Sequence, residues 1–451
     1  MNRLTSVPAT KYRRSRITAP IIVLDLFLIG LIVSGFMLLA EFDPKYNALS
    51  NCLQPDCRKH LGAEYNEIAH AIRAGRGFSD PFGETNGPTA WMPPVLPYVL
   101  SVIYWATQDH EPTVILLVIM IQGLGVLYTG FVVVNHARQL HRTLIGYIIF
   151  VVGCFANFFY LFQRTDDVVL LAPLICGTWY GFTRLWDGNV SVRAAILWGM
   201  FGGFVALCSP IFGAAWAIQT TLRWSPSIRD WRWTSQSVRR KWIRLVIASV
   251  SAIAVVTPWT LRNRMVLNRW VPIKSNGMFE LWQSQCADDD GVLDSITTSQ
   301  HPWPSSGESR KLYRELGEIP FIDKHRDLVK AAIAAAPLDF LDRVVNRWTA
   351  ACVYYHAYSP NDERMVWPMR FKRVVFALPF LSILVILFLQ KVPFAPPLAA
   401  ALGLYALVLL PYVLISYYER YAAPLIGMKM LLIVYGLDSV LNWKRSRKWS
   451  L

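Results

Sequence analysis

The sequence has few charged residues and lacks the pattern that would let its apolar residues form a β-barrel. Only 17% of its 451 residues are charged, whereas 54% are hydrophobic. The hydrophobic residues gather in runs of about 18 to 25, the length that crosses ~30 Å of hydrocarbon as a helix. Strict alternation of apolar and polar residues, which a membrane barrel needs, is missing from these runs. The sequence therefore predicts an all-α polytopic protein embedded in a lipid bilayer.

Zinc-site motifs and internal repeats are also missing from the sequence. The seven cysteines show no spacing typical of a zinc site. Cys52 and Cys57 would form a disulfide if their loop faced an oxidising compartment, and this pairing stays open. Because no repeat is visible, the chain lacks the sequence sign of an inverted-repeat transporter.

Acidic residues are outnumbered by basic ones, which gives a formal net charge of +15. The basic residues gather beside apolar runs, at 13–16, 239–244 and 444–448. Loops that carry such clusters stay in the cytoplasm, so this distribution reports membrane topology and argues against a nucleic-acid partner. The sequence therefore predicts a multi-pass protein of the plasma (inner) membrane with cytoplasmic N- and C-termini.

Apolar runs and charge parity together predict about ten transmembrane helices. The predicted spans are 20–40, 112–135, 143–161, 168–186, 194–208, 210–222, 243–261, 372–390, 394–416 and 421–441. The first is too long for a signal-peptide core, so we expect it to be retained. A further span over 91–106 would place the later basic clusters outside, so that piece is predicted to be a juxtamembrane or re-entrant helix.

The predicted topology divides the chain into three parts. Residues 1–261 form a transmembrane module, with a first outer loop at 41–111 and a second at 162–167. Residues 262–371 form a larger extracytoplasmic region, and residues 372–451 form the C-terminal transmembrane helices.

The first outer loop contains two recognisable features. Tyr65, Ile68 and Ile72 fall on one face of a short helix, which would lie on the membrane surface and place Glu64 at the water–lipid boundary. Glu64 would be either a functional carboxylate or a solvated charge on an interfacial helix, and both interpretations stay open. Trp91, followed by prolines, is typical of an indole at the membrane interface.

Further charged residues lie at the predicted outer edge of the bilayer. Asp166 and Asp167 would bind a divalent cation such as Mg²⁺ or Mn²⁺, orient a substrate, or cap the next helix, and these alternatives stay open. Arg262 and Arg420 run against the positive-inside bias. A guanidinium is suited to a phosphate, although pairing with a neighbour such as Glu419 would also explain Arg420.

Short motifs spread over most of the chain resemble a known family. After the Tyr-bearing helix come GRGF at 75–78, PTAWMPP at 88–94, RTDD at 164–167, PWTLRN at 258–263 and ERYAAPL at 419–425. Their order and predicted sidedness resemble the membrane glycosyltransferases of the C superfamily. The nearest branch is that of the bacterial protein O-mannosyltransferase-like and aminoarabinose-transferase-like enzymes.

This resemblance implies a hexosyltransferase-type enzyme of the cell envelope that acts on the extracytoplasmic face. Its donor would be a polyprenyl-phosphate-linked sugar, and its acceptor a glycan, lipid or protein. Asp166 and Asp167 match the family's second-loop acidic site, which sometimes acts through a metal. Arg262 and Arg420 are assigned to the donor phosphate.

The chain departs from the family at the expected general base. Family members carry Asp three or four residues before the loop tyrosine, where this chain has Leu61 and Gly62. Glu64 is the nearest replacement, with Asp56 and Asp43 as alternatives. A noncatalytic diverged subunit therefore stays open, as does a transporter or flippase for lipid-linked glycans. The position of the charges, at the outer edge rather than the midplane, favours the transferase.

Overall fold

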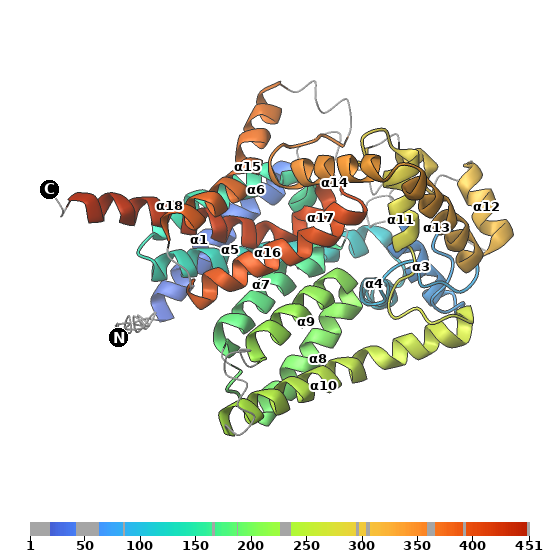
Figure 1. Ribbon diagram of the computed structural model, residues 1–451, viewed down its shortest axis with the longest axis horizontal. Coiled ribbons are helices and arrows are strands. Elements are labelled where there is room, and N and C mark those ends of the chain that lie inside the picture. The colour runs from blue at the N-terminus through green and yellow to red at the C-terminus, as the bar shows by residue number, and fades with distance from the viewer. Residues whose placement is uncertain are drawn as a thin grey trace.

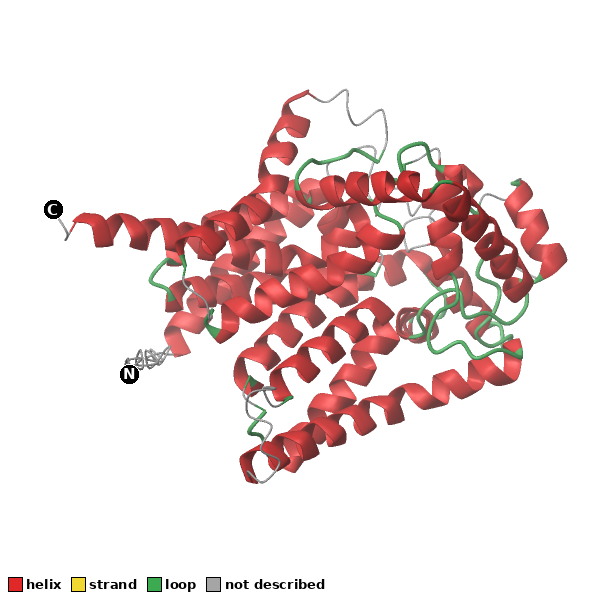
Figure 2. Ribbon diagram, in the orientation of Figure 1, coloured by secondary structure: helices red, strands yellow, loops and turns green. Residues whose placement is uncertain are grey.

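The structure is a computed structural model in which helices are the regular elements. It describes residues 19–41, 63–83, 86–164, 167–186, 188–225, 236–294, 297–303, 307–358, 366–390 and 394–448. Within these ranges strand pairing is limited to isolated bridges, and Figure 2 shows helices joined by loops. The predicted all-α class is therefore confirmed.

Six helical segments of the described chain are long and apolar enough to cross a membrane. They lie in α1 (Ala19–Glu41), α5 (Glu111–Gln139), α10 (Gln236–Leu267), α15 (Val366–Leu389), α16 (Pro396–Ile415) and the run formed by α17 (Glu419–Ala422), η7 (Ala423–Leu425) and α18 (Ile426–Lys448). Shorter helices pack among them: α6 (Thr143–Ala156), α7 (Val168–Leu185), α8 (Val192–Cys208) and α9 (Pro210–Trp224). A membrane protein is thus supported, while the total of ten spans stays a prediction.

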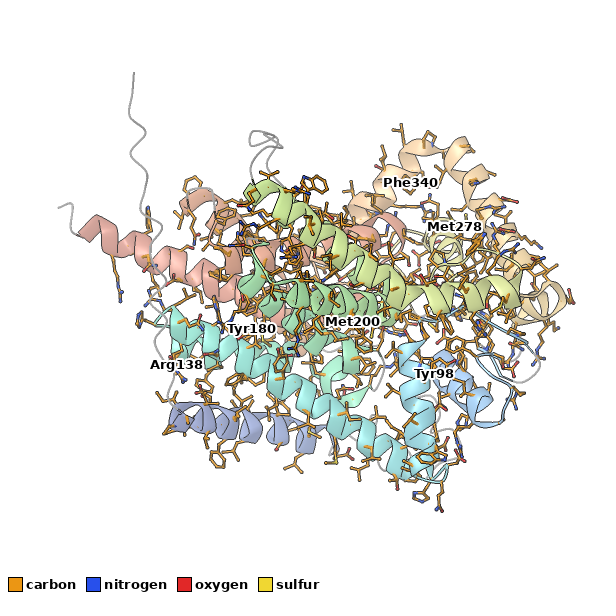
Figure 3. All side chains as sticks on the ribbon, turned by 90° about the horizontal axis from the view of Figure 1, so that it is seen from below. Tyr98, Arg138, Tyr180, Met200, Met278 and Phe340 are labelled. Atoms are coloured by element: carbon orange, nitrogen blue, oxygen red, sulfur yellow. The ribbon has the colours of Figure 1, made fainter. Side chains whose placement is uncertain are left out.

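The two ends of the helical bundle differ in character. The first residues of α1 and the last residues of α18 lie at one end, and Arg138, near the end of α5, lies there too (Figures 1 and 3). The opposite end carries a set of short helices that we call the head, made of residues 63–106 and 268–335. Its elements are α3 (Ala63–Arg73), α4 (Val95–Ala106), α11 (Gly277–Trp282), η4 (Gln283–Ala287), η5 (Thr297–Gln300), α12 (Glu308–Leu316) and α13 (Glu318–Ala335).

Helix α4 corresponds to the piece for which no span was predicted. It has 12 residues, which rise about 18 Å at 1.5 Å per residue, well short of ~30 Å of hydrocarbon. It packs mainly against α3 of the head. The helix is too short to cross the hydrocarbon by itself, and its juxtamembrane or re-entrant placement stays a prediction.

A buried carboxylate, that of Glu318, holds the head together. One oxygen accepts from the backbone N–H of Ala90 and the hydroxyl of Ser275, both at 2.9 Å. The other accepts from the hydroxyl of Tyr313 at 3.0 Å and from that of Thr89. Burial raises the pKa of Glu318, against the opposing effect of these four donors. The start of α13 is thereby joined to a loop more than 200 residues earlier in the chain.

Trp91 lies in the centre of the head and not at the membrane interface, where the sequence predicted it. Its side chain is 0% exposed. The ring makes edge contacts with Phe82 at 5.0 Å, Tyr313 at 5.7 Å and His301 at 5.9 Å between ring centres. The prediction was wrong because these aromatic partners come from sequence-distant segments that enclose the indole completely.

Arg347 joins the bundle to the head at the end of α16. It lies on α14 (Pro337–Cys352) and donates to the carbonyls of Val413 at 2.7 Å and Leu414 at 3.3 Å. A third bond, of 2.6 Å, reaches the hydroxyl of Ser284 in η4. The carbonyls of Val413 and Leu414 belong to the last turn of α16, which leaves them without intrahelical partners. The buried guanidinium of Arg347 supplies these partners.

Close packing of α8 against α10 depends on glycine. A Cβ on Gly199 would lie 2.2 Å from the carbonyl oxygen of Ala248, and one on Gly203 would lie 2.6 Å from that of Ala252. Two glycines spaced by four residues let helix backbones approach closely in a membrane, where van der Waals contact drives association.

We expect Gly199→Ala to destabilise the protein by about 1–3 kcal/mol, because the added methyl group would overlap a backbone carbonyl that cannot move alone. Thermal unfolding of detergent-solubilised protein measures the effect. Gly35→Ala on α1 is the matched control, since nothing lies within 4 Å of its Cβ position. Equal stability of the two variants would contradict close α8–α10 packing.

Candidate functional site

A cavity of about 620 Å³ lies where the head meets the helical bundle. Its walls come from both head segments, from the corner between α8 and α9, and from the ends of α16 and α17. Among the described residues, the charged side chains that line it are Glu64, Arg164, Asp167, Lys274, Glu280 and Arg420. Three cations and three carboxylates of the described chain therefore share a cavity at one end of an apolar bundle.

Residues predicted from the sequence meet in this cavity. Glu64, in the first turn of α3, lines one wall. Asp167, directly before α7, and Arg420, on α17, line another part of it. They come from three segments separated by more than 100 residues each, so their convergence is a property of the fold.

Arg420 and Asp167 face each other across a loose ion pair. The Nε and one terminal nitrogen of Arg420 both lie 3.4 Å from the same oxygen of Asp167. Another terminal nitrogen donates to the hydroxyl of Tyr418 at 3.3 Å. Asp167 occupies the N-cap position of α7, yet its side chain makes no capping hydrogen bond. Its carboxylate is directed to the arginine, so capping does not explain this residue.

A second ion pair, which sequence reasoning missed, lines the same cavity. The Nζ of Lys274 lies 2.9 Å from an oxygen of Glu280, and the amide of Asn276 donates to that oxygen at 3.0 Å. Lys274 precedes α11 and Glu280 lies in its first turn, in a segment without a recognisable motif. The one sequence signal was the predicted outer location of this segment, where a lysine is unexpected.

Glu64 approaches a histidine that sequence reasoning also missed. The Nε2 of His301 lies 3.5 Å from an oxygen of Glu64, and both side chains line the cavity. His301 follows the short helix η5, whose first N–H is accepted by Asp294 at 3.0 Å. The other base candidates, Asp43 and Asp56, lie outside the described residues, as do Cys52 and Cys57.

Arg262 does not line the cavity, in contrast to its predicted contact with a donor phosphate. Its guanidinium donates to the backbone carbonyls of Phe78 and Thr89. It also lies over the rings of Phe78, at 5.4 Å, and Trp259, at 4.9 Å. Arg262 therefore fastens the first-loop segment to α10, because its donors are used on backbone oxygens.

The described residues do not fit a divalent cation. No group of three His, Cys, Asp or Glu side chains among them could hold a metal ion, and Asp166 lies outside the described part of the chain. Asp167 has a guanidinium 3.4 Å away, whose positive charge opposes a metal ion at the same oxygen. The Mg²⁺ or Mn²⁺ site therefore stays a prediction.

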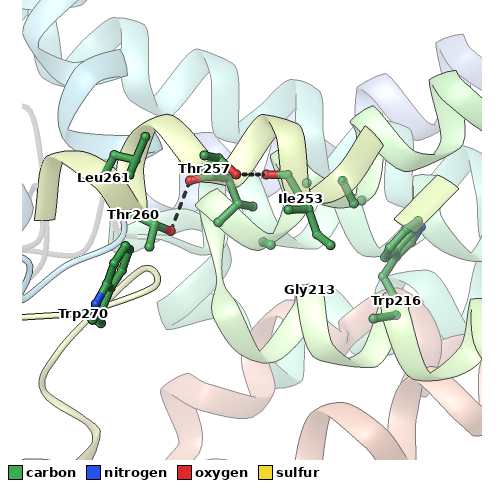
Figure 4. Close-up of a pocket in the computed structure, with 13 residues that line it drawn as sticks. Gly213, Trp216, Ile253, Thr257, Thr260, Leu261 and Trp270 are labelled. Atoms are coloured by element: carbon green, nitrogen blue, oxygen red, sulfur yellow. Dashed lines mark hydrogen bonds between the residues drawn. The ribbon is translucent and has the colours of Figure 1, made fainter. Parts of the chain in front are cut away.

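An apolar groove of about 470 Å³ lies beside the cavity on α8, α9 and α10 (Figure 4). The corner between α8 and α9, residues 208–211, lines the cavity. Ala206 lies two residues before this corner and Gly213 two residues after it, and both line the groove. At its other side, the hydroxyl of Thr260 donates to the carbonyl of Pro272 at 2.9 Å; Thr260 lines the groove and Pro272 the cavity. A charged cavity thus adjoins an apolar groove.

Comparisons of this chain with protein-family models, with curated proteins and with solved structures found no match. The functional interpretation therefore depends on the site itself.

We expect Arg420→Gln to weaken the binding of inorganic phosphate by about 10- to 100-fold. Loss of a charge-assisted hydrogen bond costs about 1.5–3 kcal/mol, and 1.4 kcal/mol corresponds to a factor of ten. Isothermal titration calorimetry of the solubilised protein measures the dissociation constant. Arg73→Gln is the control, because Arg73 pairs with Asp109 and does not line the cavity. A phosphate affinity unchanged by the Arg420 substitution would contradict the predicted contact between Arg420 and a phosphate.

Proposed function

We propose that this protein is an integral-membrane glycosyltransferase that moves a sugar from a polyprenyl-phosphate-linked donor to a glycan, lipid or protein acceptor. The observation that carries the proposal is the single cavity that contains Glu64, Asp167 and Arg420. The loop tyrosine motif indicates Glu64 in the sequence, and the predicted outer edge of the bilayer indicates Asp167 and Arg420. Their presence in one cavity supports a site at which a base and a phosphate-binding cation act together.

The positively charged side chains of the cavity would stabilise a phosphate leaving group. As the bond between the sugar C1 and the phosphate oxygen breaks, the electron pair remains on that oxygen. Preorganised donors that face this developing charge lower the barrier. Arg164, Lys274 and Arg420 supply positive charge around the cavity, where a guanidinium is suited to contact a phosphate.

The carboxylates of the cavity would activate the acceptor and orient the arginine. Glu64 would take the proton of the acceptor hydroxyl while its oxygen forms the new bond to C1, and polyprenyl phosphate would leave from the opposite face. General-base assistance of this kind contributes about 10²–10⁴-fold. Asp167 would orient the arginine and, before reaction, balance its charge.

The groove beside the cavity supports a donor with a long apolar chain. A polyprenyl phosphate is charged at one end and apolar along the rest, and the charged cavity adjoins an apolar groove in the same way. The head lies at the end of the bundle opposite to the start of α1 and the end of α18, and Arg138 lies at the same end as these (Figures 1 and 3). By the positive-inside rule, the cavity would then face the extracytoplasmic side of the plasma membrane.

The decisive experiment supplies a polyprenyl-phosphate sugar together with a glycan, lipid or protein acceptor to detergent-solubilised protein and measures released polyprenyl phosphate. We expect release by the wild type and a loss of at least about 100-fold in Glu64→Gln and in Asp167→Asn. Asp109→Asn, outside the cavity, should retain full activity. A flippase requires a sealed membrane, so turnover in detergent separates the two functions. Full activity of both cavity variants would contradict the proposed site.

A second experiment tests the groove through donor chain length. We expect Thr257→Trp to raise the KM for a long-chain donor several-fold and to leave that for a short-chain donor unchanged, because Thr257 lines the groove but not the cavity. Steady-state kinetics with both donors measures the difference. Leu124→Trp, at an exposed position of α5, is the control. An equal effect on both donors would exclude the groove as the chain site.

A further inference from the structure

The backbone around His301 determines which of its ring nitrogens carries the proton. The N–H of Trp303 donates to Nδ1 at 3.1 Å, so Nδ1 must be an acceptor. In a neutral imidazole the other nitrogen is then protonated. That nitrogen, Nε2, is the one that lies 3.5 Å from the Glu64 carboxylate. His301 therefore presents an N–H group to the predicted base.

The orientation of the imidazole is constrained by aromatic side chains. Phe82 and Phe279 contact it at 5.6 Å, and Trp91 at 5.9 Å, in each case edge to face. Its side chain is only 15% exposed. A ring enclosed on these sides cannot follow a moving carboxylate, so the carboxylate must adapt to the ring.

The charges that face His301 come from three elements. Glu64 on α3 and Glu280 on α11 raise its pKa, whereas Arg420 on α17 lowers it. Burial is the largest effect, and the net result is a pKa below the ordinary histidine value. The imidazole is therefore neutral at pH 7, which agrees with the acceptor role of Nδ1.

We propose that His301 is a positioning residue, whose Nε2–H holds the Glu64 carboxylate in the orientation that takes a proton from the acceptor. The inference rests on the proposed glycosyl transfer. The separation of 3.5 Å is longer than a strong hydrogen bond, and such contacts often shorten only when substrate is bound. With one oxygen held by His301, the other is left to face the acceptor hydroxyl.

Two substitutions of His301 separate positioning from simple packing. Gln places an N–H group close to the position of Nε2, whereas Leu fills a similar volume without a donor. We expect His301→Leu to lower kcat by about 10–100-fold with little change in the KM for the donor. His301→Gln should recover most of that rate. His325→Gln is the matched control, because His325 is also enclosed by aromatic rings but does not line the cavity.

The pH dependence gives a signature that packing would not produce. When His301 is protonated, Nδ1 can no longer accept from Trp303, and the cation stabilises Glu64 in its charged form and weakens it as a base. We therefore expect kcat to fall in acid solution, below the ordinary histidine pKa of about 6.5. In His301→Gln, kcat should not fall over the pH interval between the ordinary pKa of histidine and that of a carboxylate. Equal rates for Leu and Gln, with an unchanged pH profile, would overturn the positioning role.

A measurement without catalysis distinguishes failure of this inference from failure of the proposed function. In protein labelled with ¹⁵N-histidine, the signal lost in His301→Gln identifies the residue, and its chemical shifts report the tautomer and the titration midpoint. We expect the Nε2–H tautomer, and a lower midpoint in Glu64→Gln because a negative charge beside the ring is removed. The Nδ1–H tautomer, or an unmoved midpoint, would refute the contact even if the protein transfers no sugar.

Discussion

The architecture of the site depends on the buried carboxylate of Glu318. Four donors from Thr89, Ala90, Ser275 and Tyr313 converge on its two oxygens. Leaving such donors unsatisfied in the interior costs about 1–3 kcal/mol each, so the first-loop segment and the segment before α11 are held together as one unit. The head residues that line the cavity belong to the two segments that the Glu318 carboxylate joins.

The head in turn closes one end of an apolar bundle, and the cavity forms at that boundary. The cavity's cations and carboxylates occur in facing pairs such as Arg420–Asp167 and Lys274–Glu280, in which each charge offsets the other. Apolar residues of α8 to α10 continue directly into the neighbouring groove. The same boundary thus offers a polar and an apolar surface to one amphiphilic molecule.

Sequence reasoning found part of the site for an identifiable reason. Asp167 and Arg420 lie beside apolar runs, where a charge is unexpected and therefore informative, whereas Glu64 was indicated by its position next to the loop tyrosine, Tyr65. Lys274 and His301 lie within a long polar stretch, where neither charge nor spacing distinguishes them from solvated residues. Asp166 lies outside the described residues, so its predicted role stays untested.

The sequence by itself determined that this is an all-helical membrane protein, because long apolar runs in lipid can satisfy their backbone groups only as helices or closed barrels, and the runs do not alternate. Only the tertiary structure decided which edge charges share a cavity. Arg262 and Arg420 look equivalent in sequence, yet one guanidinium is used on the carbonyls of Phe78 and Thr89 and the other faces the cavity. That difference arises from contacts between segments more than 100 residues apart, which no local pattern encodes.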